Sequence, residues 1–111
     1  MSDCIFCKIA AKKVPSEIVF EDEYTIVFKD IRPKAKIHLL IVPKEHIQSL
    51  SHFTPEKSAL ASHMLLLLPK LAALVGLKDG FRTVINTGSG GGQEIDHIHF
   101  HLLGGGSYTK L

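Results

Sequence analysis

The sequence predicts a single α+β domain, with an antiparallel sheet of about five strands, one short helix and one long helix. Histidine alternates with apolar residues from 97 to 103, and four further segments have the composition of strands. Residues 54–75 carry an apolar stripe at helical spacing. A chain of 111 residues is long enough for one domain with its own core. We expect residues 3–106 to form that domain and residues 107–111 to be a C-terminal tail.

The first third of the chain predicts a helix followed by three strands. Apolar residues at positions 5, 6, 9 and 10 have helical spacing, which predicts a short helix that Pro15 ends. Residues 18–20 and 25–28 flank a polar turn and predict an antiparallel hairpin. Residues 37–42 are almost wholly apolar, as in a central strand covered on both faces.

A long helix is predicted next. Thr54 and Pro55 form a favoured N-cap and N1 pair, and Gly76 suits the position after the C-cap. Pro69 removes one backbone hydrogen bond and crowds the preceding turn, so we expect a kink or a break there. The residues that should face the sheet share one stripe: Leu60, Met64, Leu68, Leu71 and Val75.

Residues 81–86 predict a further strand, and the glycine-rich segment 87–93 connects it to the histidine strand. Glycines can adopt positive φ and turn several N–H groups toward one point, which forms an anion-binding nest. The alternative is a flexible hairpin connection. The position of the segment just before three histidines favours anion binding.

Three imidazoles should share one face of the strand over residues 97–103. Neighbouring histidines would stand roughly 6.6 Å apart at the backbone, and Ile98, Phe100 and Leu102 would fill the core from the other face. One possibility is a metal bound by His97 and His99. The other is phosphoryl chemistry, with His99 as nucleophile and donors from His101, His38 and Asn86. We favour the second, because no acidic metal cluster or phosphate-binding Walker loop is present in the sequence.

Composition excludes several classes of function. The net charge is +2 and no basic run exceeds two residues, so we expect no nucleic-acid partner. No apolar run is long enough to span a membrane, and the N-terminus lacks the apolar region of a signal peptide. We therefore expect a cytoplasmic protein whose Cys4 and Cys7 are reduced.

The chain resembles the histidine triad superfamily, whose pattern of three histidines alternating with apolar residues is matched in full by residues 97–103. It is most similar to bacterial-type members of the Hint branch. The further matching pieces are Phe6-x-Lys8-Ile9, Phe20-Glu21-Asp22, Asp30-Ile31, His38-x-Leu40-x-Val42-Pro43-Lys44-x-His46-Ile47, and Asn86, Gly88, Gly92 and Gln93.

The resemblance implies a nucleotide-binding hydrolase that acts at the α-phosphate of nucleoside phosphoramidates, typically of AMP. By position, His99 would become nucleotidylated, His101 would contact the phosphate, and His38 and His97 would support them. Asp30 would bind the ribose, and Glu94 stands where a serine is thought to assist the leaving group. The implied base site is Phe6, Ile9, Phe28, Ile31 and Leu40, and the implied phosphate end is Asn86, Gly92 and Gln93.

The same resemblance implies a homodimer, and it implies a reaction that requires no cofactor. Some similar members hold a structural zinc, for which the candidate ligands here are Cys4, Cys7, His46 and His97. An empty, reduced cysteine pair is the alternative. Two other functions stay open: a dinucleoside polyphosphate hydrolase, and a nucleotide-binding regulatory module with incidental catalysis.

Overall fold

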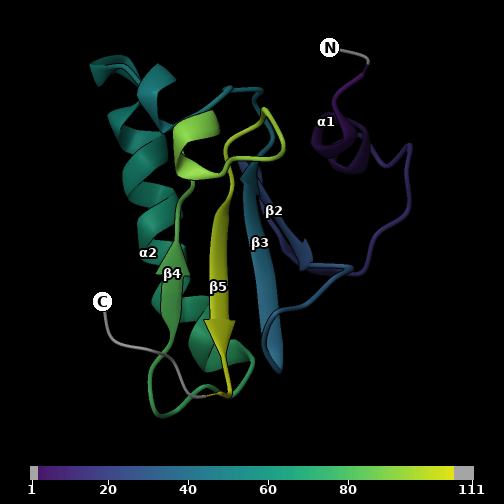
Figure 1. The fold of residues 1–111 in the computed structure, drawn as a ribbon, viewed down its shortest axis with the longest axis vertical. Helices are drawn as coiled ribbons and strands as arrows, with labels where there is room; N and C mark the ends of the chain where they lie inside the picture. Colours follow the sequence, from purple (N-terminus) through teal and green to yellow (C-terminus); the bar gives the residue numbers. More distant parts are fainter. Residues whose placement is uncertain (1–2, 107–111) are drawn as a thin grey trace.

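The computed structural model describes residues 3–106, and the predicted tail over 107–111 lies outside them. It confirms an α+β fold with a five-stranded antiparallel sheet in the order β1-β2-β3-β5-β4 (Figure 1). The strands are β1 (Ile18–Glu21), β2 (Thr25–Lys29), β3 (Ile37–Pro43), β4 (Arg82–Val84) and β5 (Phe100–Gly104). The α-helices are α1 (Ile5–Ala10) and α2 (Ser58–Leu74).

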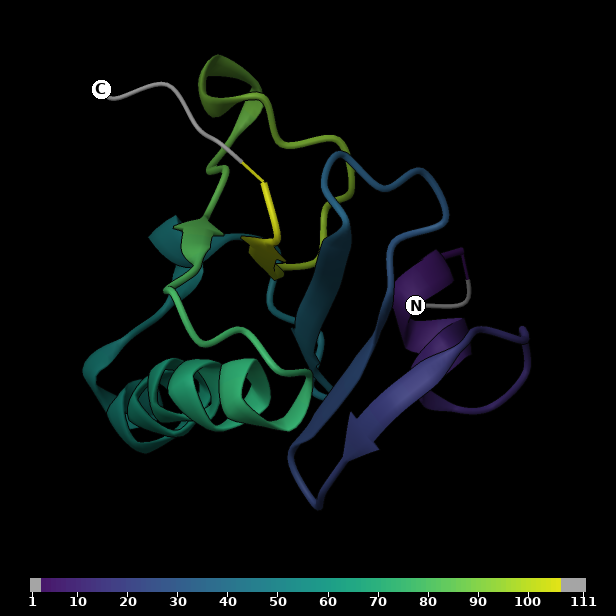
Figure 2. The ribbon, with the colours of Figure 1, turned by 90° about the horizontal axis from the view of Figure 1, so that it is seen from below.

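The two helices lie on opposite faces of the sheet (Figure 2). Successive strand residues point to opposite faces, so each strand supplies both cores. The α2 core includes Val27, Leu39, Ile41, Met64, Leu68, Leu71, Ile98, Phe100 and Leu102. The α1 core is smaller and consists of Phe6, Ile9, Ile26, Phe28, Leu40 and Val42. Because β3 contributes to both, it is buried on both faces, as predicted.

Helix α1 ends five residues before Pro15, so the prediction that this proline ends the helix is wrong. The last helical residue is Ala10, and Lys12 adopts a φ of 63°. The N–H of Lys13 donates to the Lys8 carbonyl at 2.8 Å across this left-handed residue. A left-handed residue turns the chain out of the helix before it reaches the proline.

The start of α2 also differs from the prediction. Pro55–Lys57 forms a 3₁₀ turn, and the α-helix begins at Ser58. Thr54 has extended backbone geometry but its side chain caps no backbone N–H. Its hydroxyl instead bonds the Glu56 carboxylate and lowers the pKa of that group.

The predicted break at Pro69 does not occur, because α2 is continuous through it. Pro69 and Leu65, whose carbonyl would have accepted the missing hydrogen bond, are both exposed, so water can satisfy that carbonyl. The helix ends at Leu74 with Val75 as C-cap, and Gly76 follows the C-cap as expected, with a φ of 80° and an N–H from Leu77 to the Ala72 carbonyl at 2.9 Å. No helix within residues 3–106 has the length and apolar character needed to cross a membrane.

The last two strands are shorter than predicted. Strand β4 ends at Val84, which pairs with His101, and β5 begins at Phe100 rather than at 97. The ladder between β3 and β5 ends at the pair Ile41 and Phe100, and beyond it the Ile98 N–H donates to the Ile47 carbonyl at 2.7 Å. Alternation of faces nevertheless continues upstream of the strand, because Ile98 and Phe100 both pack against α2.

Candidate active site

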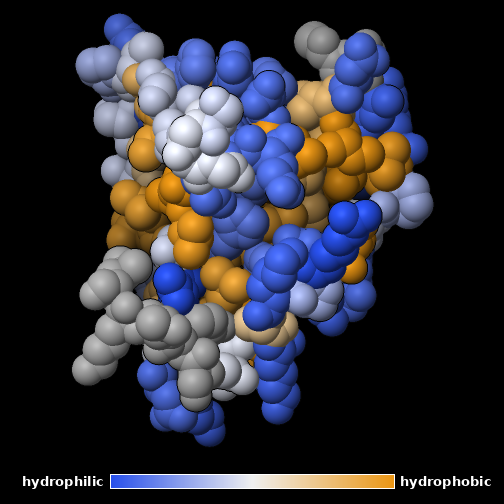
Figure 3. All heavy atoms as spheres, viewed as in Figure 1, coloured by the Kyte–Doolittle hydropathy of each residue, from blue (hydrophilic) through white to orange (hydrophobic). Residues whose placement is uncertain are grey.

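A cleft of about 700 Å³ crosses the face of the sheet that carries α1. Its walls come from α1, β2, β3, β5, β4 and the segment after β4, so it spans most of the strand order. Apolar surface beside α1 borders hydrophilic side chains over the centre of the sheet (Figure 3). The predicted residues that line it are Phe6, Ile9, Phe28, Asp30, Ile31, His38, Leu40, Asn86, Gly92, Glu94, His99 and His101.

The end of the cleft beside β2 is apolar. The rings of Phe6 and Phe28 meet edge to face with their centroids 5.4 Å apart, and Ile9 and Leu40 are buried beside them. Ile31 forms the outer rim and is 88% exposed. Asp30 lies next to this rim, where one carboxylate oxygen accepts from the Arg32 N–H at 2.8 Å. An apolar slot with an acidic group at its mouth suits a flat base attached to a hydroxylated sugar.

The proton positions on His38 and His101 follow from a backbone donor. The Lys34 N–H donates to Nδ1 of His38 at 3.0 Å, so the neutral His38 ring carries its proton on Nε2. That Nε2–H donates to Nδ1 of His101 at 2.9 Å. The proton of neutral His101 is therefore on Nε2, from which it can donate to a ligand.

His99 has the opposite tautomer. Its Nδ1 lies 2.8 Å from the His97 carbonyl oxygen, which can only accept, so Nδ1 carries the proton. The ring is buried, with Phe6 edge-on at 5.1 Å between centroids and His101 at 5.0 Å. Nε2 of His99 consequently keeps an unprotonated lone pair, as a nucleophile requires.

The glycine-rich segment folds into a 3₁₀ turn over Ser89–Gly91 that uses its own amides. Gly88 and Gly92 have φ values of 69° and 80°. The N–H groups of Gly91, Gly92 and Gln93 donate to carbonyls within the turn, and that of Gly88 donates to the Gln93 side chain. These four amides are therefore not available to an anion, whereas none of the hydrogen bonds within residues 3–106 uses the N–H of Ser89 or Gly90, so the predicted anion nest stays a prediction that rests on those two groups.

Two amide side chains hold this turn in place. Asn86 donates from Nδ2 to the Gly91 carbonyl at 2.8 Å and also lines the cleft. Gln93 donates from Nε2 to the carbonyls of Gln48 and Ile95 at 2.7 and 2.8 Å, and it does not line the cleft. Gln93 therefore positions the loop from outside.

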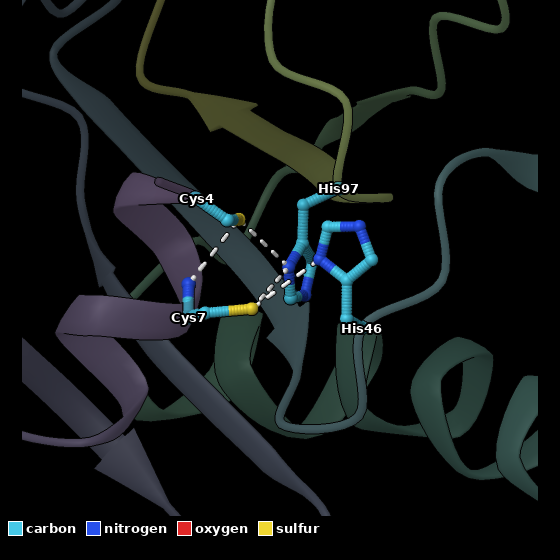
Figure 4. A group of neighbouring side chains, drawn as sticks. All are labelled: Cys4, Cys7, His46 and His97. Atoms are coloured by element: carbon cyan, nitrogen blue, oxygen red, sulfur yellow. Dashed lines mark hydrogen bonds between the residues drawn. The ribbon is translucent and has the colours of Figure 1, made fainter. Parts of the chain in front are cut away.

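His97 points away from the cleft, toward the two cysteines. Sγ of Cys4 lies 3.3 Å from Nδ1 of His97, and Sγ of Cys7 lies 3.3 Å from Nδ1 of His46 (Figure 4). Nε2 of His97 donates to the Pro43 carbonyl at 2.8 Å, which leaves its Nδ1 unprotonated on the side of the sulfur atoms.

These four side chains fit a zinc ion. Their ligand atoms all lie within 4.8 Å of one another. With Zn–S near 2.3 Å and Zn–N near 2.0 Å, tetrahedral ligands stand roughly 3.6 Å apart, close to the observed 3.3–3.6 Å between sulfur and nitrogen. Partial burial, followed by the hydrogen bond and charge of Cys4, raises the pKa of the Cys7 thiol. A cation would offset that cost by stabilising the thiolate.

A second group of potential metal ligands consists of Asp30, His38 and His101. The hydrogen bond between the His38 and His101 rings explains why their nitrogen atoms lie so close together, and an Asp30 carboxylate oxygen lies 3.5 Å from Nε2 of His38. His99 belongs to neither group. The geometry of the described residues thus gives no support to a metal shared by His97 and His99.

Comparisons with known proteins agree on one family. The family model described as "Scavenger mRNA decapping enzyme C-term binding" matches residues 3–110. Protein HitA of Neisseria gonorrhoeae is 53% identical over 104 residues, which are 94% of this chain and 97% of that protein. An uncharacterized HIT-like protein of Synechococcus elongatus is 48% identical over 95% of this chain and 92% of its own length.

Solved structures extend this likeness to the fold. A HIT family hydrolase from Legionella pneumophila has a TM-score of 0.93 and 48% identity, over 96% of each chain. A histidine triad protein from Clostridium difficile has a TM-score of 0.96 and 40% identity, covering 100% of this chain and 97% of that chain. The chain belongs to the histidine triad superfamily.

The histidine triad motif supplies the ring nitrogens, but other groups orient them. The Lys34 N–H and the Pro43 carbonyl fix two of the rings, and sequence reasoning missed both, because every residue offers a backbone carbonyl and every residue but proline a backbone N–H. Val84 and Ile95 also line the cleft unpredicted. Val84 stands two residues before Asn86, which also lines the cleft, so period-two alternation points to it. Ile95 stands two residues before His97, which does not line the cleft, so no such signal points to it.

Acid should destabilise this histidine triad protein through His101. Burial, followed by the charges of His99 and His38, lowers the pKa of His101 from 6.5 to about 4. Burial also lowers the pKa of His38. Below about pH 6.5 these histidines bind protons in the unfolded chain but stay neutral in the folded protein. The free energy of unfolding therefore falls as the pH falls toward 4. We expect the urea midpoint to decrease between pH 7 and 5, and to decrease less in His101→Gln. Equal decreases in both proteins would contradict this assignment.

Proposed function

We propose that this protein is a nucleotide-binding hydrolase that releases the amine from nucleoside phosphoramidates, with AMP or another purine nucleotide as the nucleoside phosphate. The observation that carries the proposal is the tautomer of His99, whose bare Nε2 lies in a cleft with an apolar slot at one end. Membership of the histidine triad superfamily, and a relative described as a HIT family hydrolase, support it.

The nucleotide lies along the cleft in the order of the strands. Its base occupies the slot between Phe6, Ile9, Phe28, Ile31 and Leu40, and its ribose hydroxyls donate to Asp30. The α-phosphate then lies over His99 and His101. The Nε2–H of His101 and the free N–H of Asn86 donate to the phosphate oxygens, where negative charge accumulates during the reaction.

In the first step, Nε2 of His99 forms a bond to phosphorus and the P–N bond to the amine breaks. The electron pair of that bond goes to the amine nitrogen, which takes up a proton from solvent at the exposed end of the cleft. His99 keeps its proton on Nδ1 and becomes a cationic nucleotidyl-imidazolium. The His97 carbonyl oxygen stabilises that cation by accepting from Nδ1.

In the second step, water attacks phosphorus and the bond to Nε2 of His99 breaks. The electron pair returns to Nε2, and the proton lost by water passes to solvent. AMP and the free enzyme are the products. The covalent intermediate thus replaces one difficult displacement by two easier ones.

Turnover of an adenosine 5′-phosphoramidate tests this function. We expect AMP release, and quenching during turnover with an alkaline denaturant, in which the P–N bond to histidine is stable, should trap protein whose mass is increased by one AMP moiety. Peptide mapping should place the adduct on His99. Tight AMP binding without turnover of any phosphoramidate would instead favour a nucleotide-binding regulatory module.

The catalytic steps need no metal or cofactor. We propose a structural zinc on Cys4, Cys7, His46 and His97, because two sulfur and two imidazole donors form a set that zinc prefers. It would fasten α1, and with it Phe6, to the segment that carries His97. The cytoplasm is the proposed location, since its reducing environment keeps Cys4 and Cys7 as thiols that can bind zinc.

We also propose a homodimer through α2 and the free edge of β4. Strand β4 ends the sheet, and Leu66 and Leu74 of α2 are 72% and 62% exposed. Leu66→Glu should convert the dimer to a monomer in sedimentation experiments, because a buried charge is costly at an apolar interface. Ile18→Glu, on β1 at the opposite edge, is the control that should stay dimeric. A wild-type monomer would contradict the proposal.

A further inference from the structure

A carboxylate without a partner lies at one end of the cleft. Glu94 lines it together with Asn86, Gly92 and Ile95. The residue is exposed, and none of the hydrogen bonds or ion pairs within residues 3–106 involves its side chain. A carboxylate that holds no structural contact is free to act on a ligand.

The order of the strands gives the part of the ligand that Glu94 would meet. Phe28 on β2 marks the apolar end, His101 on β5 lies further along, and Val84 on β4 marks the opposite edge of the sheet. Under the proposed function, on which this inference rests, the base lies at β2 and the α-phosphate over β5. The leaving group continues toward β4 and the glycine turn, where Glu94 lies.

The charges of the cleft differ between its two ends. Its cationic residues, Lys29, Arg32 and Lys34, lie at the end of β2 and in the loop before β3. The lining residues of the other end within the described chain include no lysine or arginine: Val84, Asn86, Gly92, Glu94 and Ile95. A polyphosphate leaving group would bring its anionic oxygens toward a carboxylate with no lining cation to compensate.

We propose that Glu94 selects substrates by the charge of the leaving group. It favours nucleoside phosphoramidates whose amine carries a positive charge, and it disfavours dinucleoside polyphosphates. When the P–N bond breaks, its electron pair goes to nitrogen, which takes a proton from solvent and departs as an amine. The carboxylate attracts a cationic amine both in the bound substrate and as it leaves, whereas it repels a departing phosphate.

Three substrates test this selectivity: the AMP phosphoramidates of a diamine and of an uncharged alkylamine, and a diadenosine polyphosphate. In Glu94→Gln, the ratio of kcat/KM for the diamine compound to that for the alkylamine compound should fall about 10-fold. The kcat/KM for the polyphosphate should rise severalfold. Glu23→Gln removes the same charge from an exposed site outside the cleft and should change neither quantity.

The possible outcomes separate the two proposals. If the wild-type enzyme hydrolyses phosphoramidates but Glu94→Gln changes all three substrates by the same factor, the selectivity is overturned and the hydrolase function stands. If the wild-type enzyme hydrolyses none of the three, the function fails and the selectivity fails with it. Isothermal titration with AMP, which has no leaving group, should give a similar Kd for both variants. A large loss of AMP affinity would show that Glu94 supports the structure of the nucleotide site, which would overturn its proposed role toward the leaving group.

Discussion

Replacing His99 by alanine is expected to reduce turnover of an adenosine phosphoramidate by about 10³-fold or more, because no other group can form the covalent intermediate. The Nε2 lone pair of His99 results from the hydrogen bond between its Nδ1 and the His97 carbonyl. The trapped nucleotidyl adduct should disappear from the mass spectrum together with the activity. Single-turnover kinetics with the purified variant measure both effects.

Two controls separate this chemical loss from a loss of structure. His99→Ala should still bind AMP, because the apolar slot and Asp30 are unchanged. His52→Ala removes an exposed imidazole that does not line the cleft and should keep full activity. Unchanged AMP release by His99→Ala would exclude it as the nucleophile.

Loss of the proposed zinc site should have the largest effect on stability. Metal analysis is expected to find about one zinc per chain, and the double variant Cys4→Ser, Cys7→Ser should contain none. We expect its Tm to fall by roughly 10–20 °C, which corresponds to about 3 kcal/mol of unfolding free energy. Helix α1 has only six residues, too few to be stable without such an attachment.

The same variant should bind AMP more weakly, since Phe6 lies between the two cysteines and lines the base slot. Lys8→Ser changes the same helix without removing a ligand and should behave like the wild type. Removal of zinc with a chelator should leave residual turnover, because the metal is not part of the reaction. Zinc-loaded and metal-free wild-type protein that melt at the same temperature would show that zinc contributes nothing to stability.

Apolar runs, period-two alternation and helical spacing predict the five strands and both helices, because these patterns depend on side-chain burial alone. They could not predict where hydrogen bonding begins. His97 and His99 alternate with apolar residues, yet the strand starts only at Phe100, where its pairing with Ile41 of β3 begins. Pairing depends on a distant segment, whereas alternation depends only on the local chain.

The glycine turn shows the same limit at the site. Glycines at 88 and 92 correctly indicated positive φ, but composition does not say which acceptor each N–H finds. The resemblance implies that Gln93 holds the phosphate end, which stays a prediction, and composition gave no sign that its side-chain amide bonds Gly88, Gln48 and Ile95. The separation of His97 from the other two histidines likewise depends on Cys4 and Cys7, which are 93 and 90 residues away in the chain.

The protonation of the histidines is set by peptide groups, and this has a consequence for how the protein can evolve. The Lys34 N–H, the His97 carbonyl and the Pro43 carbonyl hold three rings in defined tautomers. Almost any side chain at position 34 would leave its N–H in place, so natural variation there can proceed without altering the reactive atoms. Proline at position 34 is the exception, because it has no N–H to donate. Sequence change around this site is therefore constrained more by the conformation of the main chain than by the identity of the side chains.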